Sequence, residues 1–183
     1  MKEIRIHGRG GQGSIVLAEL MAVAALEDGK YGQSFPFLGG GGERKGKPIM
    51  AFCRLCEQPI RIRSRVNEPD YVIVQDATIL EELDVTQGIK EGGMILVNSD
   101  KNAANLNREG AFHVYTFSAD TIARKIIKKG LTNTALLGAF AALTKELSLD
   151  AVVRAVEHKF SAEMAQKNIQ ILRSSYFLFS REK

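Results

Sequence analysis

The chain has 183 residues, of which 45% are hydrophobic, and this length and composition fit a globular protein with a full core. Its 25 Lys and Arg are interleaved with 21 Asp and Glu, so the net charge of +4 suits an anionic ligand or an acidic partner but is too small to indicate nucleic-acid binding. The charged start and the lack of a long apolar run lead us to expect a single cytoplasmic domain over residues 1–183, with no signal peptide and no membrane span.

The first segment predicts a strand followed by a glycine-rich turn. Ile4 and Ile6 alternate in a short β-type run, and Gly8, Gly10 and Gly13 then follow the G-x-G-x-x-G spacing. Glycine permits a positive φ in such a turn and lets a phosphate approach bare backbone amides. The motif alone also fits a turn that only packs a strand against a helix, so both interpretations remain open.

A helix is expected next, from Ser14 to Glu27, with Gly29 in the left-handed conformation just after its end. Its first amides have no intrahelical partner and the helix dipole is positive there, which favours an anion. On the loop, Arg9 offers a guanidinium suited to phosphate, and Gln12 offers an amide. Because the helix is apolar at nearly every position, we expect it to be covered on several sides.

A second strand is expected over residues 30–38, broken by Pro36. In an NAD-binding unit, this strand ends in an acidic residue about 20 positions after the glycines. Here that zone holds Gln33, Ser34 and Phe35, which argues against NAD.

Residues 39–48 contain the run Gly39–Gly42 and three basic side chains, and they predict a flexible loop. The loop is either a solvated connection or an arm that carries Arg44, Lys45 and Lys47 to an anion or an acidic neighbour.

Two further strands are predicted over residues 49–55 and 59–63, joined as a β-hairpin by a turn at Gln58-Pro59. Cys53 and Cys56 have C-x-x-C spacing, but residues three apart on a strand face opposite sides, and no second ligand pair accompanies them. We therefore expect structural cysteines and no metal site.

Residues 71–74 and 94–97 are apolar at every position, as in strands of a parallel sheet that is covered on both faces. Gln75-Asp76 follows the first of these strands, and Asn98 comes directly after the second. Because ligands of open α/β sheets bind at the carboxyl ends of strands, Asp76 and Asn98 either rim the same crevice as the glycine turn or merely cap the next segments of the chain.

The second half of the chain predicts one more strand, over residues 113–117, and then helices. The first helix is expected to run from Ser118 or Asp120 to Lys129, before Gly130. An apolar helix over residues 135–143 comes next, in which Gly138 allows close packing.

Thr132 or Asn133 is expected to cap this apolar helix, and its start either meets a ligand or is simply capped. Two more helices are expected over residues 148–159 and 161–173. The apolar end of the chain, residues 176–179, either completes the core or docks on another subunit.

Taken together, several segments resemble the gamma subunits of the pyruvate:ferredoxin oxidoreductases, within the 2-oxoacid:ferredoxin oxidoreductase family. The matching segments occur in the same order and at the same intervals: Arg5 to Gly13, Gln33-Ser34-Phe35-Pro36, Glu43-Arg44-Lys45-Gly46-Lys47-Pro48 with Ala51-Phe52 and Arg54, and Asn133-Thr134-Ala135-Leu136-Leu137-Gly138. The second and third segments are typical of the pyruvate or 2-oxoisovalerate branch. The four-glycine run departs from the expected family pattern.

The resemblance implies an α/β fold, a single Rossmann-like domain with a largely parallel sheet flanked by helices. It implies a subunit of a complex that converts pyruvate to acetyl-coenzyme A and reduces ferredoxin. Thiamine diphosphate would lie in the alpha and beta chains and [4Fe-4S] clusters in the beta and delta chains, with neither group and no catalytic residue in this chain. Its own share would be coenzyme A binding by Gly10, Gly11, Gln12, Gly13, Ser34, Phe35 and Asn133.

Three alternatives accompany this interpretation. The chain is a subunit of a 2-oxoisovalerate-type complex, or a free-standing NAD(P)-dependent oxidoreductase in which Arg44 and Lys45 hold a 2′-phosphate. The third alternative is a structural adaptor whose glycine loop serves packing alone.

Overall fold

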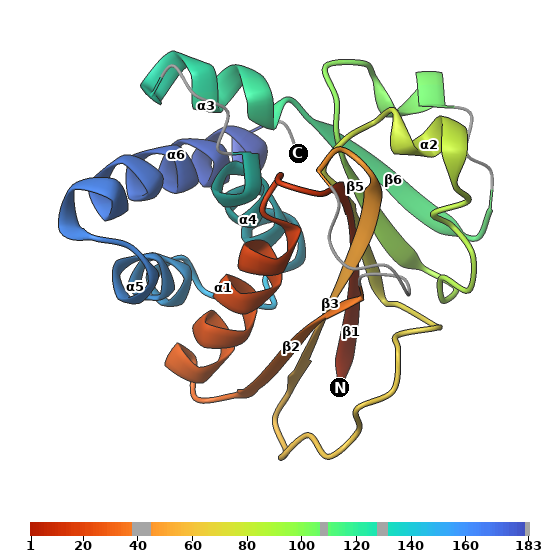
Figure 1. Ribbon diagram of the computed structural model, residues 1–183, viewed down its shortest axis with the longest axis horizontal. Coiled ribbons are helices and arrows are strands. Elements are labelled where there is room, and N and C mark those ends of the chain that lie inside the picture. The colour runs from red at the N-terminus through yellow and green to blue at the C-terminus, as the bar shows by residue number, and fades with distance from the viewer. Residues whose placement is uncertain (38–44, 107–109, 128–131, 182–183) are drawn as a thin grey trace.

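The computed structural model describes residues 1–37, 45–106, 110–127 and 132–181. Six strands form one sheet in the order β2-β3-β1-β4-β5-β6 (Figure 1). The strands are β1 (Lys2–Arg9), β2 (Tyr31–Phe37), β3 (Pro48–Cys56), β4 (Tyr71–Val74), β5 (Gly93–Asn98) and β6 (Phe112–Phe117). The strands β1, β4, β5 and β6 lie side by side in this order and are all parallel. The strand β3 is antiparallel to both of its neighbours, β1 and β2. The predicted α/β fold with a largely parallel sheet is confirmed.

Helices cover the sheet unequally (Figure 1). One face carries α1 (Ser14–Glu27), α3 (Ala119–Ile127), α4 (Thr132–Thr144), α5 (Leu149–Lys159) and α6 (Ala162–Arg181). The short helix α2 (Ile79–Glu82) lies on the opposite face, and a 3-10 turn spans Ala103–Leu106. No helix in the described ranges is long and apolar enough to cross a bilayer.

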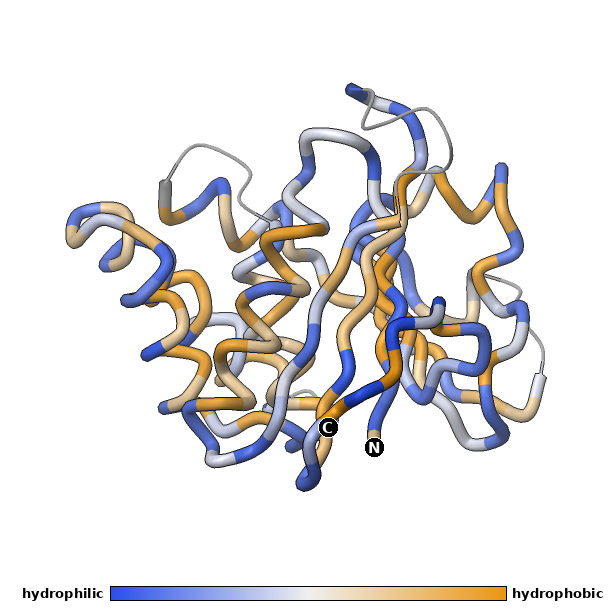
Figure 2. The backbone as a smooth tube through the Cα atoms, turned by 60° about the horizontal axis from the view of Figure 1, so that its bottom comes forward, coloured by the Kyte–Doolittle hydropathy of each residue, from blue (hydrophilic) through white to orange (hydrophobic). Residues whose placement is uncertain are grey.

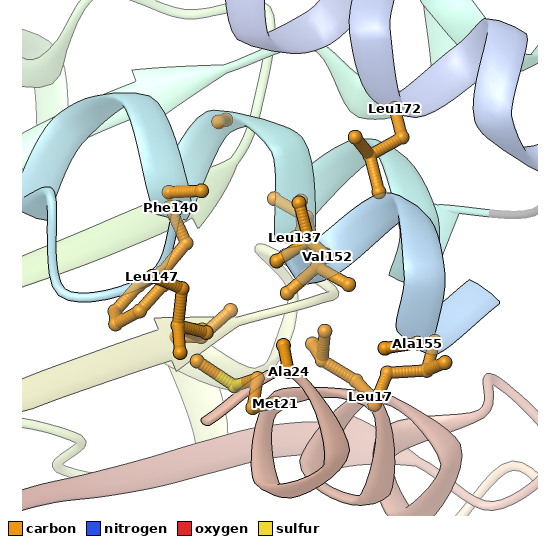
Figure 3. Close-up of a cluster of buried hydrophobic side chains, with 14 of the residues drawn as sticks. Leu17, Met21, Ala24, Leu137, Phe140, Leu147, Val152, Ala155 and Leu172 are labelled. Atoms are coloured by element: carbon orange, nitrogen blue, oxygen red, sulfur yellow. The ribbon is translucent and has the colours of Figure 1, made fainter. Parts of the chain in front are cut away.

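The main core lies between the sheet and the larger helical layer. In Figure 3, α1 packs against α4 and α5, and α6 packs against α4 and α5, through one cluster of buried aliphatic and aromatic side chains: Leu17, Met21, Leu137, Phe140, Val152 and Leu172. Hydrophobic positions concentrate in the strands and helices, and hydrophilic ones in the connections (Figure 2). The apolar helices α1 and α4 are therefore covered on several sides within the chain, as predicted for α1.

The structure confirms the predicted helix ends at several positions. The bounds of α1 are those predicted, with Gly29 at a φ of 73° after its end. Ser148 caps α5 by accepting a hydrogen bond from the Ala151 amide at 3.1 Å. Gly138 permits a close helix contact, because a Cβ there would lie 2.3 Å from the Leu172 carbonyl oxygen on α6.

The predicted β-hairpin is wrong. Residues 59–63 form no strand, because β3 already has β1 on one side and β2 on the other and offers no free edge for pairing. Pro36 does not break its strand either. It pairs with Ala51 inside β2, where a proline is tolerated because β2 is the edge strand.

The C-terminal helix is longer than predicted, since α6 continues past Arg173 to Arg181. The apolar residues near its end lie in two different environments. Phe179 is buried against Tyr115 and Phe117 and completes the core, whereas Phe177 remains exposed. The predicted end of α3 at Lys129 lies outside the described residues.

His7 gives a testable pH dependence. It is buried on β1, where burial and then the charge of Arg5 lower its pKa to about 3. Its Nε2 accepts a hydrogen bond from Arg5 at 3.1 Å. Because this pKa is below the unfolded value of about 6.5, the unfolded chain gains a proton first as the pH falls, so stability declines between pH 6.5 and 3.

We expect the free energy of unfolding to fall by about 1.4 kcal/mol for each pH unit below 6.5 from this residue alone. Urea denaturation at about pH 7 and pH 5 measures the loss. The His7→Gln variant is the control, because glutamine retains an acceptor for Arg5 but does not titrate. Equal pH dependence in both proteins would exclude His7 as the cause.

Candidate functional site

A crevice of about 950 Å³ opens at the carboxyl ends of the parallel strands. This is the edge at which open α/β sheets bind ligands. Its walls are the glycine loop (residues 10–13, between β1 and α1), the segments after β4 and β5, and the starts of α3 and α4. The lining residues include Gly11, Gln12, Gly13, Gln75, Asp76, Thr78, Asn98, Ser99, Asp120 and Asn133. Asp76 and Asn98 therefore rim the same crevice as the glycine loop, one of the two predicted possibilities.

The glycines of the β1–α1 turn perform different tasks. Gly11 and Gly13 have φ angles of 91° and 78°, which L side chains rarely adopt. Gly8 is needed for space, because a Cβ there would lie 2.1 Å from the Ser14 Oγ. Gly13 is the N-cap of α1 and supplies no side-chain cap, so the first amides of α1 are left for an anion or water at the crevice.

Gly10 has a structural task instead. Its amide donates to the Lys47 carbonyl at 2.9 Å, and its own carbonyl accepts from the Gly46 amide at 3.0 Å. The predicted basic loop thus returns directly beside the glycine turn, with exposed Lys45 and Lys47. The run Gly39–Gly42 and Arg44 lie outside the described residues.

Arg9 does not offer a free guanidinium to a ligand, contrary to the sequence interpretation. It lies 2.6 Å from a Glu82 carboxylate oxygen and 3.3 Å from one of Asp76. Its Nη2 also donates to the Thr78 hydroxyl at 2.6 Å. Arg9 therefore ties β1 to the segment that follows β4.

The Gln12 side chain is also engaged. Its Oε1 accepts from the Arg9 amide at 2.8 Å, and its Nε2 donates to Asp76 at 2.9 Å. Burial acts to raise the pKa of Asp76, but hydrogen bonds from Thr78 and Gln12 outweigh it and hold that pKa below its ordinary value. Gln12 braces the loop and presents an ionised Asp76 at the rim.

Asn133 lies in the first turn of α4, and its side chain lies beside Gly13. It is 7% exposed, and its Oδ1 accepts the Thr134 amide at 2.9 Å. Its Nδ2 lies 2.9 Å from where a Cβ of Gly13 would stand. Thr132 and Asn133 both lie within the helix itself, whereas the sequence predicted that one of them would cap it.

Ser34 and Phe35 are not part of this crevice. Both lie on the edge strand β2, which is separated from β1 by β3. Ser34 lines a smaller apolar groove between α1 and α5, and Phe35 packs against Phe52 with ring centroids 5.2 Å apart. The structure thus unites Gly11, Gln12, Gly13 and Asn133 in one crevice and leaves these two outside it.

Asn98 holds together the wall of the crevice that is formed by the ends of β4 and β5 and the start of α3, a role that the sequence did not reveal. Its Nδ2 donates to the Gln75 carbonyl and to the Asp120 carboxylate, both at 2.9 Å, and its Oδ1 accepts the Ala119 amide at 3.0 Å. One side chain thereby joins the ends of β4 and β5 to the start of α3. The available signal was a polar residue directly after a wholly apolar strand.

The strand order bears on the NAD(P) alternative. In a dinucleotide-binding fold, the strand that carries the ribose-binding acid runs parallel beside the first strand. Here the antiparallel β3 holds that position and β2 is displaced to the edge.

Among the described residues there is no group of three metal-ligating side chains. Cys53 is buried, which raises the pKa of its thiol, and Cys56 is half-buried.

Fold and crevice together define a Rossmann-like α/β protein with a glycine-lined crevice at the carboxyl ends of its parallel strands. Residues 3–177 match the family model for pyruvate ferredoxin/flavodoxin oxidoreductase. The chain belongs to this family.

Relatives give the position within the family. The pyruvate synthase subunit PorC of Methanosarcina barkeri is 51% identical over 85% of both chains. The common gamma subunit of the pyruvate/ketoisovalerate oxidoreductases of Thermococcus litoralis is 42% identical over 96% of both. The solved pyruvate oxidoreductase subunit PORC of Thermotoga maritima is 35% identical, with a TM-score of 0.82 over 96% of this chain and 95% of its own. The chain is a gamma-type subunit of an oxidoreductase complex.

Proposed function

We propose that this gamma-type subunit binds the phosphate-bearing part of coenzyme A in the crevice while the complex converts pyruvate to acetyl-coenzyme A. The observation that carries the proposal is the uncapped start of α1, opened by Gly13 and flanked by the Asn133 amide. Backbone amides at a helix start bind phosphate without needing a cationic side chain. Lys45, beside Gly10, adds positive charge at the same edge.

The bond-breaking chemistry belongs in this proposal to other chains. Thiamine diphosphate and the iron–sulfur clusters would be held by alpha, beta and delta subunits, which pass electrons to ferredoxin. This chain would act as one domain over residues 1–183 in the cytoplasm. In this proposal the crevice binds and orients coenzyme A and breaks no bond, because its polar side chains already hold one another, as Gln12 holds Asp76.

A second candidate concerns the substrate of the complex. The Thermococcus litoralis relative is named as common to pyruvate and ketoisovalerate oxidoreductases. A gamma subunit that binds only the acyl carrier would serve either 2-oxoacid. Activity of the reconstituted complex with both acids distinguishes a shared subunit from a dedicated one.

The proposal predicts a specific effect of Asn133→Asp in the reconstituted complex. Aspartate keeps the oxygen that accepts the Thr134 amide but replaces the Nδ2 donor with negative charge beside the phosphate site. We expect coenzyme A affinity to fall roughly tenfold or more, as for a like charge set against a bound anion. Isothermal titration calorimetry measures the change.

Ser34→Ala is the matched control, because Ser34 lies on β2 outside the crevice. We expect its coenzyme A affinity to equal that of the wild type. Unchanged affinity in Asn133→Asp would favour the structural adaptor. Saturable NADPH binding by the isolated chain, followed by fluorescence, would favour the NAD(P) alternative.

A further inference from the structure

A basic strap, defined as residues 58–65, connects β3 toward β4 (the yellow loop of Figure 1). Along it Arg61, Arg63 and Arg65 alternate with Ile60, Ile62 and Ser64, and it contains no acidic residue. All three arginines are exposed, and Ile62 is 48% exposed. The strap therefore carries exposed side chains of both kinds, charged and apolar.

The strap pairs with no strand in the described part of the chain, yet it is fixed by a side chain from the sheet. Arg54, only 1% exposed, donates from Nη2 to the Ser64 carbonyl at 2.7 Å and from Nη1 to the Ile62 carbonyl at 3.4 Å. Its Nε donates to Glu3 at 2.9 Å, which anchors the guanidinium itself. The strap backbone is therefore held against β3.

The end of the strap is fixed a second time. The Arg65 guanidinium lies 3.7 Å from the centroid of the Phe37 ring on β2. Arg65 is thereby engaged within the chain, whereas Arg61 and Arg63 have no carboxylate within ion-pair distance among the residues that the structure describes. Within that part of the chain, two arginines on an ordered backbone are left without intramolecular neutralisation.

We propose that the basic strap docks an acidic surface of another subunit of the oxidoreductase complex, an inference that rests on the proposed function. Charge complementarity is the argument: the net charge of the chain is +4, and the strap concentrates three positive charges without a negative one. Ordering by Arg54 lowers the entropy that binding must offset. Ile62, between Arg61 and Arg63, supplies the apolar contact typical of protein interfaces.

A nucleic acid fits this surface less well. A polyanion needs a continuous row of cations, whereas the strap is flanked by exposed Glu57 and Glu68. Arg65 is also already stacked on Phe37. A compact acidic protein patch needs only the two central arginines.

The test compares three proteins, each co-expressed with the remaining subunits of the complex. They are the wild type, Arg61→Glu/Arg63→Glu, and the control Arg173→Glu/Arg181→Glu, which reverses two exposed charges on α6. Circular dichroism verifies folding. Sedimentation of the purified mixtures then gives the dissociation constant of the gamma-type chain from the complex.

The dissociation constant of the strap variant is expected to be roughly tenfold higher than that of the wild type, or more. The dissociation constant of the α6 variant is expected to equal that of the wild type. A roughly tenfold rise in salt should weaken wild-type assembly more than that of the strap variant. Equal assembly of all three proteins would overturn the strap inference and leave the proposed function standing. Failure of the wild type to assemble would overturn both, and oligonucleotide binding lost only in the strap variant would assign the strap to nucleic acid instead.

Discussion

Gly13→Ala is expected to weaken coenzyme A binding by the assembled complex on the order of tenfold to a hundredfold, as a loss of about 1.4–3 kcal/mol implies. Two physical effects combine at this position. The φ of 78° is strained for alanine, and the new Cβ would lie 2.9 Å from the Asn133 Nδ2. Asn133 must then move, and the methyl group narrows access to the first amides of α1. Calorimetric titration with coenzyme A measures the loss.

Gly29→Ala separates backbone strain from damage to the crevice. Gly29 has a φ of 73° just beyond the other end of α1, and nothing lies within 4 Å of a Cβ built there. This control is expected to lose about 1–2 kcal/mol of stability but to bind coenzyme A like the wild type. If both variants lost the same affinity, strain in α1 would explain the effect and the crevice would not.

Arg54→Met is expected to lower the free energy of unfolding by about 3–5 kcal/mol, the range for breaking a buried ion pair by removing one partner. The guanidinium is 1% exposed and binds Glu3, Gln33 and the strap carbonyls. Methionine fills a similar volume but leaves the Glu3 carboxylate without its partner and releases the strap. Urea denaturation of the isolated chain gives the change.

Arg154→Met is the matched control. Arg154 also binds a carboxylate, that of Glu27 at 2.7 Å, but its side chain is 44% exposed. Surface ion pairs of this kind contribute about 0–1 kcal/mol. Comparable losses in the two variants would contradict the special position of Arg54, and limited proteolysis near residue 62 would report whether the strap is released.

The sequence predicted local structure well where neighbouring residues decide it. The apolar strands β4 and β5, the bounds of α1 and the Ser148 cap depend on hydrophobic pattern and backbone chemistry within a few residues. Strand pairing was not predictable in the same way, because the alternation of residues 59–63 indicates an extended chain but not a partner. In the fold β2 occupies the edge of β3, and the strap is held by a buried arginine instead.

By itself, the sequence determined the strand–turn–helix start, the glycines that keep its amides bare and the family resemblance, because each depends on residue types at fixed spacing. Only the tertiary structure decided which groups face the crevice. It joined Asn133 to Gly13, engaged Arg9 with Glu82 and used the Gly10 amide in a loop contact. It also placed Ser34 and Phe35 on the edge strand β2, outside the crevice. The physical reason is that pairing and ion-pair partners lie far apart in the chain, and local pattern carries no information about which distant segment arrives beside it.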